Sequence, residues 1–291
     1  MIADYVSFDR RRFLRAGVAV VGLSSLPSLL QADEPKDKSL GGFKLGAQSY
    51  TFREFDLEPA LKRMKDLDLH YVELFQKHAP IDSSPAQIAA LLKLCKEYQV
   101  TPMAWGVQHF SKNTDANRKS FEFGKALGIK MFSADPDPDS FDSLDKLCDE
   151  YKIAIGIHPH GPQRGGKEHR WYSAQVILKA VKDHHPLIGS CLDTGHLIRA
   201  AQLGDKLDPA EQIGLMGARN FGVHLKDHDN KRQTDVIFGK GVLDVPGVLK
   251  ALRDVKFNGL ISIEYEAHPT DPVQDVQACV QVFKESVRKI G

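Results

Sequence analysis

Short apolar runs alternate with longer amphipathic stretches along most of the chain. The runs are rich in β-branched and aliphatic residues, as buried strands are. They span Phe43–Gln48, His70–Phe75, Val100–Val107, Ile129–Ala134, Lys152–His158, Ile188–Asp193, Asn220–Leu225 and Gly259–Glu264. Between them, apolar residues recur with helical spacing, as Ile88, Leu91, Leu92 and Cys95 do. The pattern predicts strands and helices in strict alternation.

Helical patterns fill the segments between the runs and close the chain. They cover Leu57–Asp66, Pro85–Tyr98, Asp115–Leu127, Ser140–Tyr151, Tyr172–Asp183, a region from Leu197 to Met216, Val245–Val255 and Asp271–Lys289. Eight strands alternating with eight helices predict an α/β fold, a single-domain (β/α)8 TIM barrel over residues 43–291. A doubly wound open sheet is the alternative. It would need a glycine-rich phosphate turn, and Gln48-Ser49-Tyr50 after the first strand is not one.

The N-terminal segment follows a different pattern. Arg10-Arg11-Arg12 precedes the apolar stretch Ala16–Leu30, and the small residue Ala32 stands before a charged run. This order describes an export signal, and its apolar core is too short for a comfortable transmembrane helix. It resembles a twin-arginine signal, so we expect a signal peptide at residues 1–32, a linker at 33–42 and a periplasmic protein without stable membrane insertion. An uncleaved signal acting as a membrane anchor is the alternative.

Charge and cysteine content narrow the function classes. Lys and Arg number 39 against 38 Asp and Glu, a net charge of +1 that gives no general attraction for nucleic acid. The four cysteines are far apart and form no CxxC pair, so neither a zinc knuckle nor a redox motif is indicated. We expect a small-molecule partner rather than a nucleic acid. The sequence leaves homo-oligomerisation open.

Four strand-like runs in the C-terminal half end in side chains that can bind metal. The positions are His158, Asp193, His224 and Glu264. Because the C-terminal strand ends of a barrel meet at one mouth, these side chains are expected to form one site. Mixed imidazole and carboxylate ligands suit one divalent ion, with Mn or Zn favoured over Mg or Co.

Several of these positions also allow a structural role. Asp193 precedes a turn and could cap the next helix instead. His158 and His160 share one strand face, and the sequence does not decide which of them faces an ion. Glu264 and Glu266 also share a face, where paired carboxylates favour a cation or a raised pKa. For Glu266 we expect a surface ion pair.

Further residues near strand ends are candidates for substrate contact. Glu73, Trp105 and His109 belong to the earlier strands. A tryptophan at the mouth can stack on a sugar ring, although it can equally pack in the core. Lys226 follows His224 on the same strand face, where it could bind a substrate oxygen or pair with its neighbour Asp227.

The strand-end motifs resemble those of the sugar phosphate isomerase/epimerase family, which has a xylose-isomerase-like barrel. They are Tyr71-Val72-Glu73-Leu74, Leu192-Asp193-Thr194-Gly195-His196, Val223-His224-Leu225-Lys226-Asp227 and Ile263-Glu264-Tyr265. By this resemblance Asp193, His224 and Glu264 match metal ligands, and His196 matches a residue that contacts substrate. Gly156 stands where the family has a fifth-strand Glu ligand. We therefore expect His158, or else His160, as the fourth ligand; the alternative is a site with three protein ligands and more water. The His-Pro-His stretch is similar to inosose dehydratases.

The resemblance implies a metal-dependent isomerase, epimerase or lyase acting on a sugar, keto-sugar or cyclitol. In the family, the metal stabilises the enediolate formed when a carboxylate removes the proton next to a carbonyl. We expect Glu264 to act as ligand and base, and His158, His160 or His196 as the acid. One alternative is a non-catalytic exported sugar-binding barrel. Another is a metal-dependent phosphodiesterase of the endonuclease IV type, which the near-neutral charge disfavours.

Overall fold

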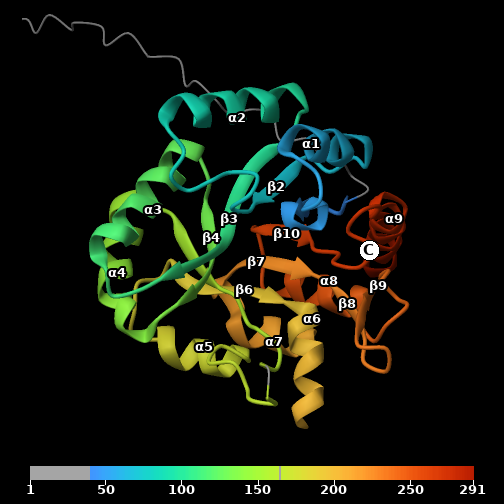
Figure 1. Ribbon diagram of the computed structural model, residues 1–291. Helices are drawn as coiled ribbons and strands as arrows, with labels where there is room; N and C mark the ends of the chain where they lie inside the picture. The colour runs from blue at the N-terminus through green and yellow to red at the C-terminus, as the bar shows by residue number, and fades with distance from the viewer. Residues whose placement is uncertain (1–39, 164) are drawn as a thin grey trace, which may run out of the picture. The chain divides into compact units, whose positions relative to one another are not determined.

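Eight parallel strands close into a barrel in the computed structural model, which describes residues 40–163 and 165–291 (Figure 1). The strands are β1 (Lys44–Gln48), β2 (Tyr71–Leu74), β3 (Thr101–Phe110), β4 (Met131–Pro136), β5 (Ala154–Ile157), β6 (Ile188–Asp193), β7 (Asn220–Leu225) and β10 (Leu260–Ile263). Their order around the barrel is β1-β10-β7-β6-β5-β4-β3-β2, so the last strand pairs with the first. The closed parallel sheet confirms the predicted TIM barrel.

Helices follow the strands and lie outside the barrel (Figure 1). They are α1 (Leu57–Asp66), α2 (Pro85–Glu97), α3 (Thr114–Leu127), α4 (Phe141–Tyr151), α5 (Ala174–Val181), α6 (Thr194–Arg199), α7 (Pro209–Met216), α8 (Val245–Asp254) and α9 (Val273–Ile290). Short 3-10 turns are η2 (Ser49–Phe52), η3 (Pro138–Ser140), η4 (Ala200–Leu203) and η5 (Gly217–Arg219). Local sequence explains several helix starts: Ser84 and Gln87 form a capping box at α2, with Pro85 in the first turn.

Two parts of the chain differ from the sequence prediction. The single region expected from Leu197 to Met216 is two helices, α6 and α7. Gly204 takes a left-handed conformation with φ 98° after η4, and Asp208 caps α7 by accepting from the N–H groups of its first turn. After β7, the unpredicted strands β8 (Asp227–Asp229) and β9 (Thr234–Val236) form an antiparallel hairpin.

One carboxylate ties the base of this hairpin to the loop that follows it. Asp227 accepts hydrogen bonds from the backbone N–H groups of His228, Gly239, Gly241, Val242 and Leu243, at 2.8–3.0 Å. Its side chain is almost completely buried. The pairing of Asp227 with Lys226 that the sequence allowed is replaced by this ring of amides.

The lower part of the barrel interior is apolar. Its buried residues include Tyr71, Ala104, Met131, Ala154, Cys191 and Leu260. Met131 occupies the space beside two glycines: a Cβ at Gly156 would lie 2.8 Å from Met131 Sδ, and one at Gly222 would lie 2.6 Å from its Cε. Any side chain at either glycine would therefore have to displace Met131.

The predicted signal peptide at residues 1–32 and most of the predicted linker at 33–42 lie outside the described residues, so both stay predictions. Within the described part of the chain, no helix is long and apolar enough to cross a membrane.

Candidate metal centre and pocket

Four side chains converge at the C-terminal end of the barrel. His158 follows β5, Asp193 ends β6, His224 lies in β7 and Glu264 follows β10. All four are buried, and one ligand atom from each lies within 4.8 Å of the others. We call this set the four-residue cluster. The parallel strands bring together residues from distant parts of the chain, as the strand-end pattern predicts.

The donor atoms of the four-residue cluster suit a cation. His158 Nε2 lies 3.0 Å from His224 Nδ1 and 3.5 Å from Asp193 Oδ2, while His224 Nδ1 lies 3.2 Å from Glu264 Oε2. Asp193 Oδ2 is buried and has no hydrogen-bond partner among the described residues. A buried carboxylate oxygen of this kind is costly unless a charge compensates it. The residues therefore fit a divalent ion.

Asp193 combines the two roles that its sequence position allowed. Its Oδ1 accepts the N–H of His196 at 2.7 Å and so caps α6. Its Oδ2 faces the four-residue cluster. Burial alone raises the pKa of Asp193, but Lys226 and the histidines around it lower that pKa well below its usual value. The cap fixes the direction in which the ionised oxygen points.

Glu73 lies beneath His224 rather than at the mouth. It is fully buried, and its Oε2 accepts from His224 Nε2 at 2.8 Å. Gln48 donates to its Oε1 at 3.1 Å, and Ser133 donates to the same oxygen. Because Nε2 donates to Glu73, Nδ1 of a neutral His224 keeps a lone pair for a metal. The structure gives Glu73 a contact with His224 and no place in the lining of the mouth pocket, and its expected contact with substrate stays a prediction.

The ammonium group of Lys226 lies among the carboxylates of the site. Its Nζ lies 2.9 Å from Glu264 Oε2 and 3.4 Å from Asp193 Oδ2, and it also pairs with Glu266. The side chain is 1% exposed and held by these carboxylates, and the expected contact of Lys226 with a substrate oxygen stays a prediction. Burial alone lowers the pKa of Lys226, but these three carboxylates raise it well above its usual value.

The same contacts set the charge of Glu264 and His224. Burial alone raises the pKa of Glu264, but Lys226 and His224 lower it to about 2, so the carboxylate is ionised. Burial alone lowers the pKa of His224, whereas Cys191, Glu73 and Glu264 raise it well above its usual value. Without another cation, His224 therefore carries positive charge in this cluster.

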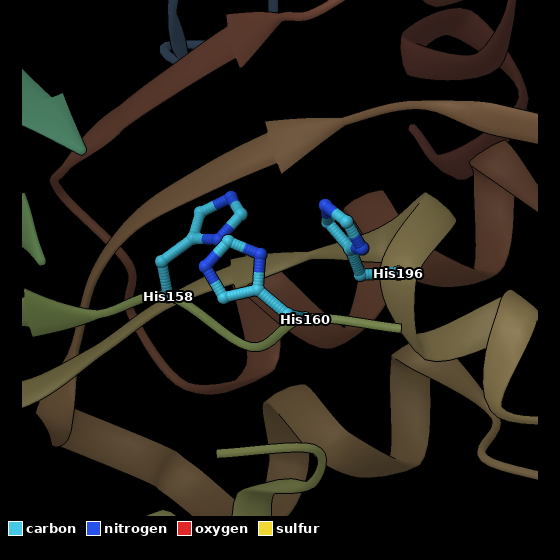
Figure 2. A group of neighbouring side chains, drawn as sticks. All are labelled: His158, His160 and His196. Carbon is cyan, nitrogen blue, oxygen red and sulfur yellow. The ribbon is translucent and has the colours of Figure 1, made fainter. Parts of the chain in front are cut away.

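His158 also belongs to a group of three histidines, together with His160 and His196 (Figure 2). The ring of His158 lies 4.8 Å from that of His160 and 5.3 Å from that of His196, centroid to centroid. Three histidines can hold a metal in principle. However, Gly161 donates its N–H to His196 Nδ1 at 2.7 Å, so a neutral His196 carries its proton on Nε2. His196 Nε2 in turn lies 3.1 Å from Arg199 Nη2, so neighbouring side chains already contact both ring nitrogens.

A third set that could hold a metal consists of Asp135, His160 and His169. One of its histidines also has a ring nitrogen occupied by a backbone N–H. Trp171 donates its N–H to His169 Nδ1 at 3.2 Å, which leaves the proton of a neutral ring on Nε2. Burial and the neighbours His158 and His169 lower the pKa of His160 to about 3, so it is neutral. Burial likewise lowers the pKa of His196 well below its usual value.

A pocket of about 480 Å³ opens beside the four-residue cluster. It is lined by Asp135, His160, Gly161, Pro162, Gln163, His169, His196, Arg199, Gln202, His228 and Gln233. His160 and His196 thus connect it to His158, which is buried. We call this space the mouth pocket.

Two expected substrate contacts are not in the mouth pocket. Trp105 is 3% exposed and packs against Phe123 and Phe132 in the outer core, with its Nε1 bonded to the carbonyl of Ala79 at 2.9 Å. The expected stacking on a sugar is corrected, because β3 directs the indole away from the barrel axis. His109 is exposed beside Asp137, 3.3 Å from its Oδ2, and does not line the pocket.

Sequence reasoning missed Asp135, Arg199 and His228, which all line the mouth pocket. Asp135 lies near the end of β4, so the strand-end rule that identified Asp193 could have found it. Arg199 ends the short helix α6, and His228 belongs to the unpredicted hairpin. No periodicity marks either of these as part of a site.

Comparisons with known proteins agree with this architecture. An uncharacterised protein from Parabacteroides distasonis has a similar structure, with 28% identity over 86% of this chain and 100% of that one, at a TM-score of 0.65. A D-tagatose 3-epimerase-like protein shares 20% identity over 85% and 98% of the two chains, with a TM-score of 0.67.

A D-psicose 3-epimerase from Clostridium cellulolyticum H10, solved with D-tagatose, shares 14% identity over 85% of this chain and 99% of that one, with a TM-score of 0.65. The last two likenesses concern the fold. No match was found among curated proteins. The family described as xylose isomerase-like TIM barrel matches residues 61–286, most of the described barrel. The chain therefore belongs to the xylose isomerase-like TIM barrel family.

Proposed function

We propose that this protein is a metal-dependent isomerase, epimerase or lyase that acts on a sugar, keto-sugar or cyclitol. The observation that carries the proposal is the convergence of two imidazoles and two carboxylates beside an open polar pocket. Asp193 Oδ2 is buried there with no hydrogen-bond partner among the described residues, and its nearest cation is Lys226 Nζ at 3.4 Å. The structural likeness to sugar 3-epimerases supports the substrate class.

His158, Asp193, His224 and Glu264 would hold one divalent ion, with Mn or Zn as the first choice and Mg or Co as further candidates. Such an ion would polarise a substrate carbonyl and offset the negative charge that develops on its oxygen. Glu73 orients His224, and the backbone of α6 orients Asp193.

In this proposal the chain's own side chains move the protons. Glu264 is ionised, so its carboxylate can accept the proton from the carbon next to the carbonyl. Neutral His160 lies in the wall of the mouth pocket and exchanges a proton with the substrate oxygen. His196 does not act as the acid, because its ring nitrogens contact Gly161 and Arg199 and its pKa is lowered well below the usual value.

Gly156 bears on the type of reaction. Symmetric epimerisation uses a base on each face of the carbon, and Gly156 offers no carboxylate on the β5 side. The space beside it is filled by Met131. One carboxylate base together with histidines suits isomerisation or β-elimination, so we favour these two reactions over epimerisation.

A non-catalytic sugar-binding barrel is the second candidate, and Lys226 is the observation that favours it. Its ammonium already contacts Asp193, Glu264 and Glu266 and supplies positive charge inside the site. Such a barrel would bind carbohydrate without needing a metal. Metal content separates the two candidates.

The experiment measures metal and proton exchange together. Elemental analysis of the purified protein is expected to find about one Mn or Zn per chain. Incubation with keto-sugars in D₂O is expected to place deuterium next to the carbonyl, or to release a leaving group if the protein is a lyase. Glu264→Gln should abolish both reactions, whereas the surface variant Glu150→Gln should leave them unchanged. Absence of a bound divalent ion would overturn the proposal.

Export by the twin-arginine route also stays a proposal, as does any homo-oligomer. Cell fractionation with Arg10→Lys, Arg11→Lys tests the route. The double variant is expected to remain in the cytoplasm, and a protein that still reaches the periplasm would contradict it.

A further inference from the structure

Two side chains that line the mouth pocket each carry a buried polar atom that lacks a partner among the described residues. They are Nε of Arg199 and Nε2 of His228. Both residues line the pocket. Buried side-chain donors and acceptors are nearly always satisfied in folded proteins, so two such atoms along one pocket call for a physical explanation.

Arg199 has no ion-pair partner among the described residues. It lies at the end of α6, and His196 is the one hydrogen-bonding partner it has in the described part of the chain, at 2.6 Å from Nη2 to Nδ1. Most of its five N–H donors therefore lack an acceptor. Arg170 nearby is different, because it pairs with Asp135 at 3.0 Å and with Asp137 at 2.5 Å.

The charges lining the pocket therefore do not balance. Asp135 is the one carboxylate among its lining residues, and Arg170 already compensates it. No other lining carboxylate offsets the charge of Arg199. An anionic oxygen group would accept the fork-shaped donors of a guanidinium in its preferred geometry.

The rest of the lining suits hydroxyl groups. Asp235 holds His228 through a 3.0 Å contact between Oδ1 and Nδ1, so a neutral His228 has a lone pair on Nε2 that can accept a hydroxyl proton. Gln163, Gln202 and Gln233 add side-chain amides around the same space. The pocket thus offers a charged donor, Arg199, together with neutral polar groups. This combination suits a ligand that has several hydroxyl groups and one acidic group.

We propose that the mouth pocket binds a carbohydrate bearing an anionic group, a carboxylate or a phosphate, with Arg199 as its counter-ion. This inference rests on the proposed function for the reaction that follows binding, and it narrows the substrate class to acidic sugars. His228 and the glutamines hold the hydroxyl groups of the same molecule.

Calorimetric titration of the purified protein with three probes tests the inference. D-Glucuronate carries a carboxylate, D-glucose 6-phosphate carries a phosphate, and D-glucose carries neither. At least one acidic probe is expected to bind about tenfold or more tightly than glucose, the size of effect given by a charge-assisted hydrogen bond. The stronger of the two acids identifies the anionic group.

Three variants and one control variant assign the effect to named side chains. Arg199→Gln should remove the preference for the acid, and Arg199→Lys should retain part of it because the charge remains. Arg118→Gln is the matched control, since Arg118 pairs with Glu150 on the surface between α3 and α4. It should bind all probes as the unchanged protein does. His228→Asn should weaken the acidic and neutral probes alike. Thermal melting checks that each variant is folded.

Three results would overturn the inference: glucose binding as tightly as both acids, Arg199→Gln retaining the preference, or no acidic probe binding at all. Its failure is distinguishable from failure of the proposed function. Metal together with deuterium exchange but no preference for acids would overturn this inference alone. An Arg199-dependent preference in a protein without metal or exchange would overturn the proposed reaction and leave the acid-binding pocket standing.

Discussion

Glu73 acts on the site through His224, one layer below the mouth. Its carboxylate accepts from His224 Nε2 at 2.8 Å and so directs Nδ1 toward the other three ligands. Glu73→Gln keeps the shape but removes the charge, so metal affinity should fall by about 10- to 100-fold. Titration with Mn²⁺ or Zn²⁺ measures this fall. Glu150→Gln on the surface is the control, and equal affinities in the two variants would show that Glu73 does not tune the metal.

Gly156 is packed against Met131 and Cys191, with no room for a Cβ. Gly156→Ala should therefore lower the free energy of unfolding by about 1–3 kcal/mol, as overpacking does. Gly214→Ala in α7 is the matched control, because a Cβ there meets nothing within 4 Å. In a helix that change should stabilise by up to about 1 kcal/mol. Urea unfolding of both variants measures the difference, and a neutral Gly156→Ala would contradict this account of the packing.

At the scale of elements, Asp227 organises the hairpin β8–β9 and the loop after it. Asp227→Asn weakens the five amide contacts and should cost on the order of 2 kcal/mol. Hydrogen exchange should accelerate at the amides of Gly239, Gly241, Val242 and Leu243. Asp183→Asn, at an exposed side chain outside the hairpin, is the control and should change little. Exchange that stays slow in Asp227→Asn would mean that the loop is held by its other contacts.

The helices, the strands and the residues at which the strands end could be predicted from the sequence, because the spacing of apolar residues indicates which positions are buried. His158, Asp193, His224 and Glu264 were brought together by the single rule that parallel strands end at one mouth. The depth and direction of other side chains could not be predicted. The pairing register of β3 shifts on both sides of Trp105, and such shifts leave no mark in the sequence. Arg199 and His228 reach the pocket through turns whose path depends on tertiary contacts.

At the scale of the whole molecule, acidification should destabilise the fold at pH values well above those at which carboxylates usually titrate. The pKa of His160 is lowered to about 3, so below its usual value of about 6.5 the unfolded chain binds a proton that the folded chain does not. The neutral His160 therefore contributes stability that is fully present above about pH 6.5 and is lost as the pH falls toward 3. His196 shifts in the same direction. Glu264, with its pKa lowered to about 2, adds a loss below about pH 4.5.

Urea unfolding at pH 7, 6, 5 and 4 in the presence of EDTA measures this dependence. The free energy of unfolding should fall steadily over that range, and His160→Gln should flatten the part between pH 7 and 5. A stability that rises on acidification would contradict the shifts.

The ion pairs of Lys226 have a consequence for the order of assembly. Because its ammonium already offsets the charges of Asp193 and Glu264, the barrel does not depend on an ion to bring β6, β7 and β10 together. The chain can therefore fold before a metal binds. A metal that binds later would replace Lys226 as the partner of these carboxylates in a barrel that is already folded. Chelation should leave the far-ultraviolet circular dichroism unchanged, whereas Lys226→Met should make the fold depend on added metal.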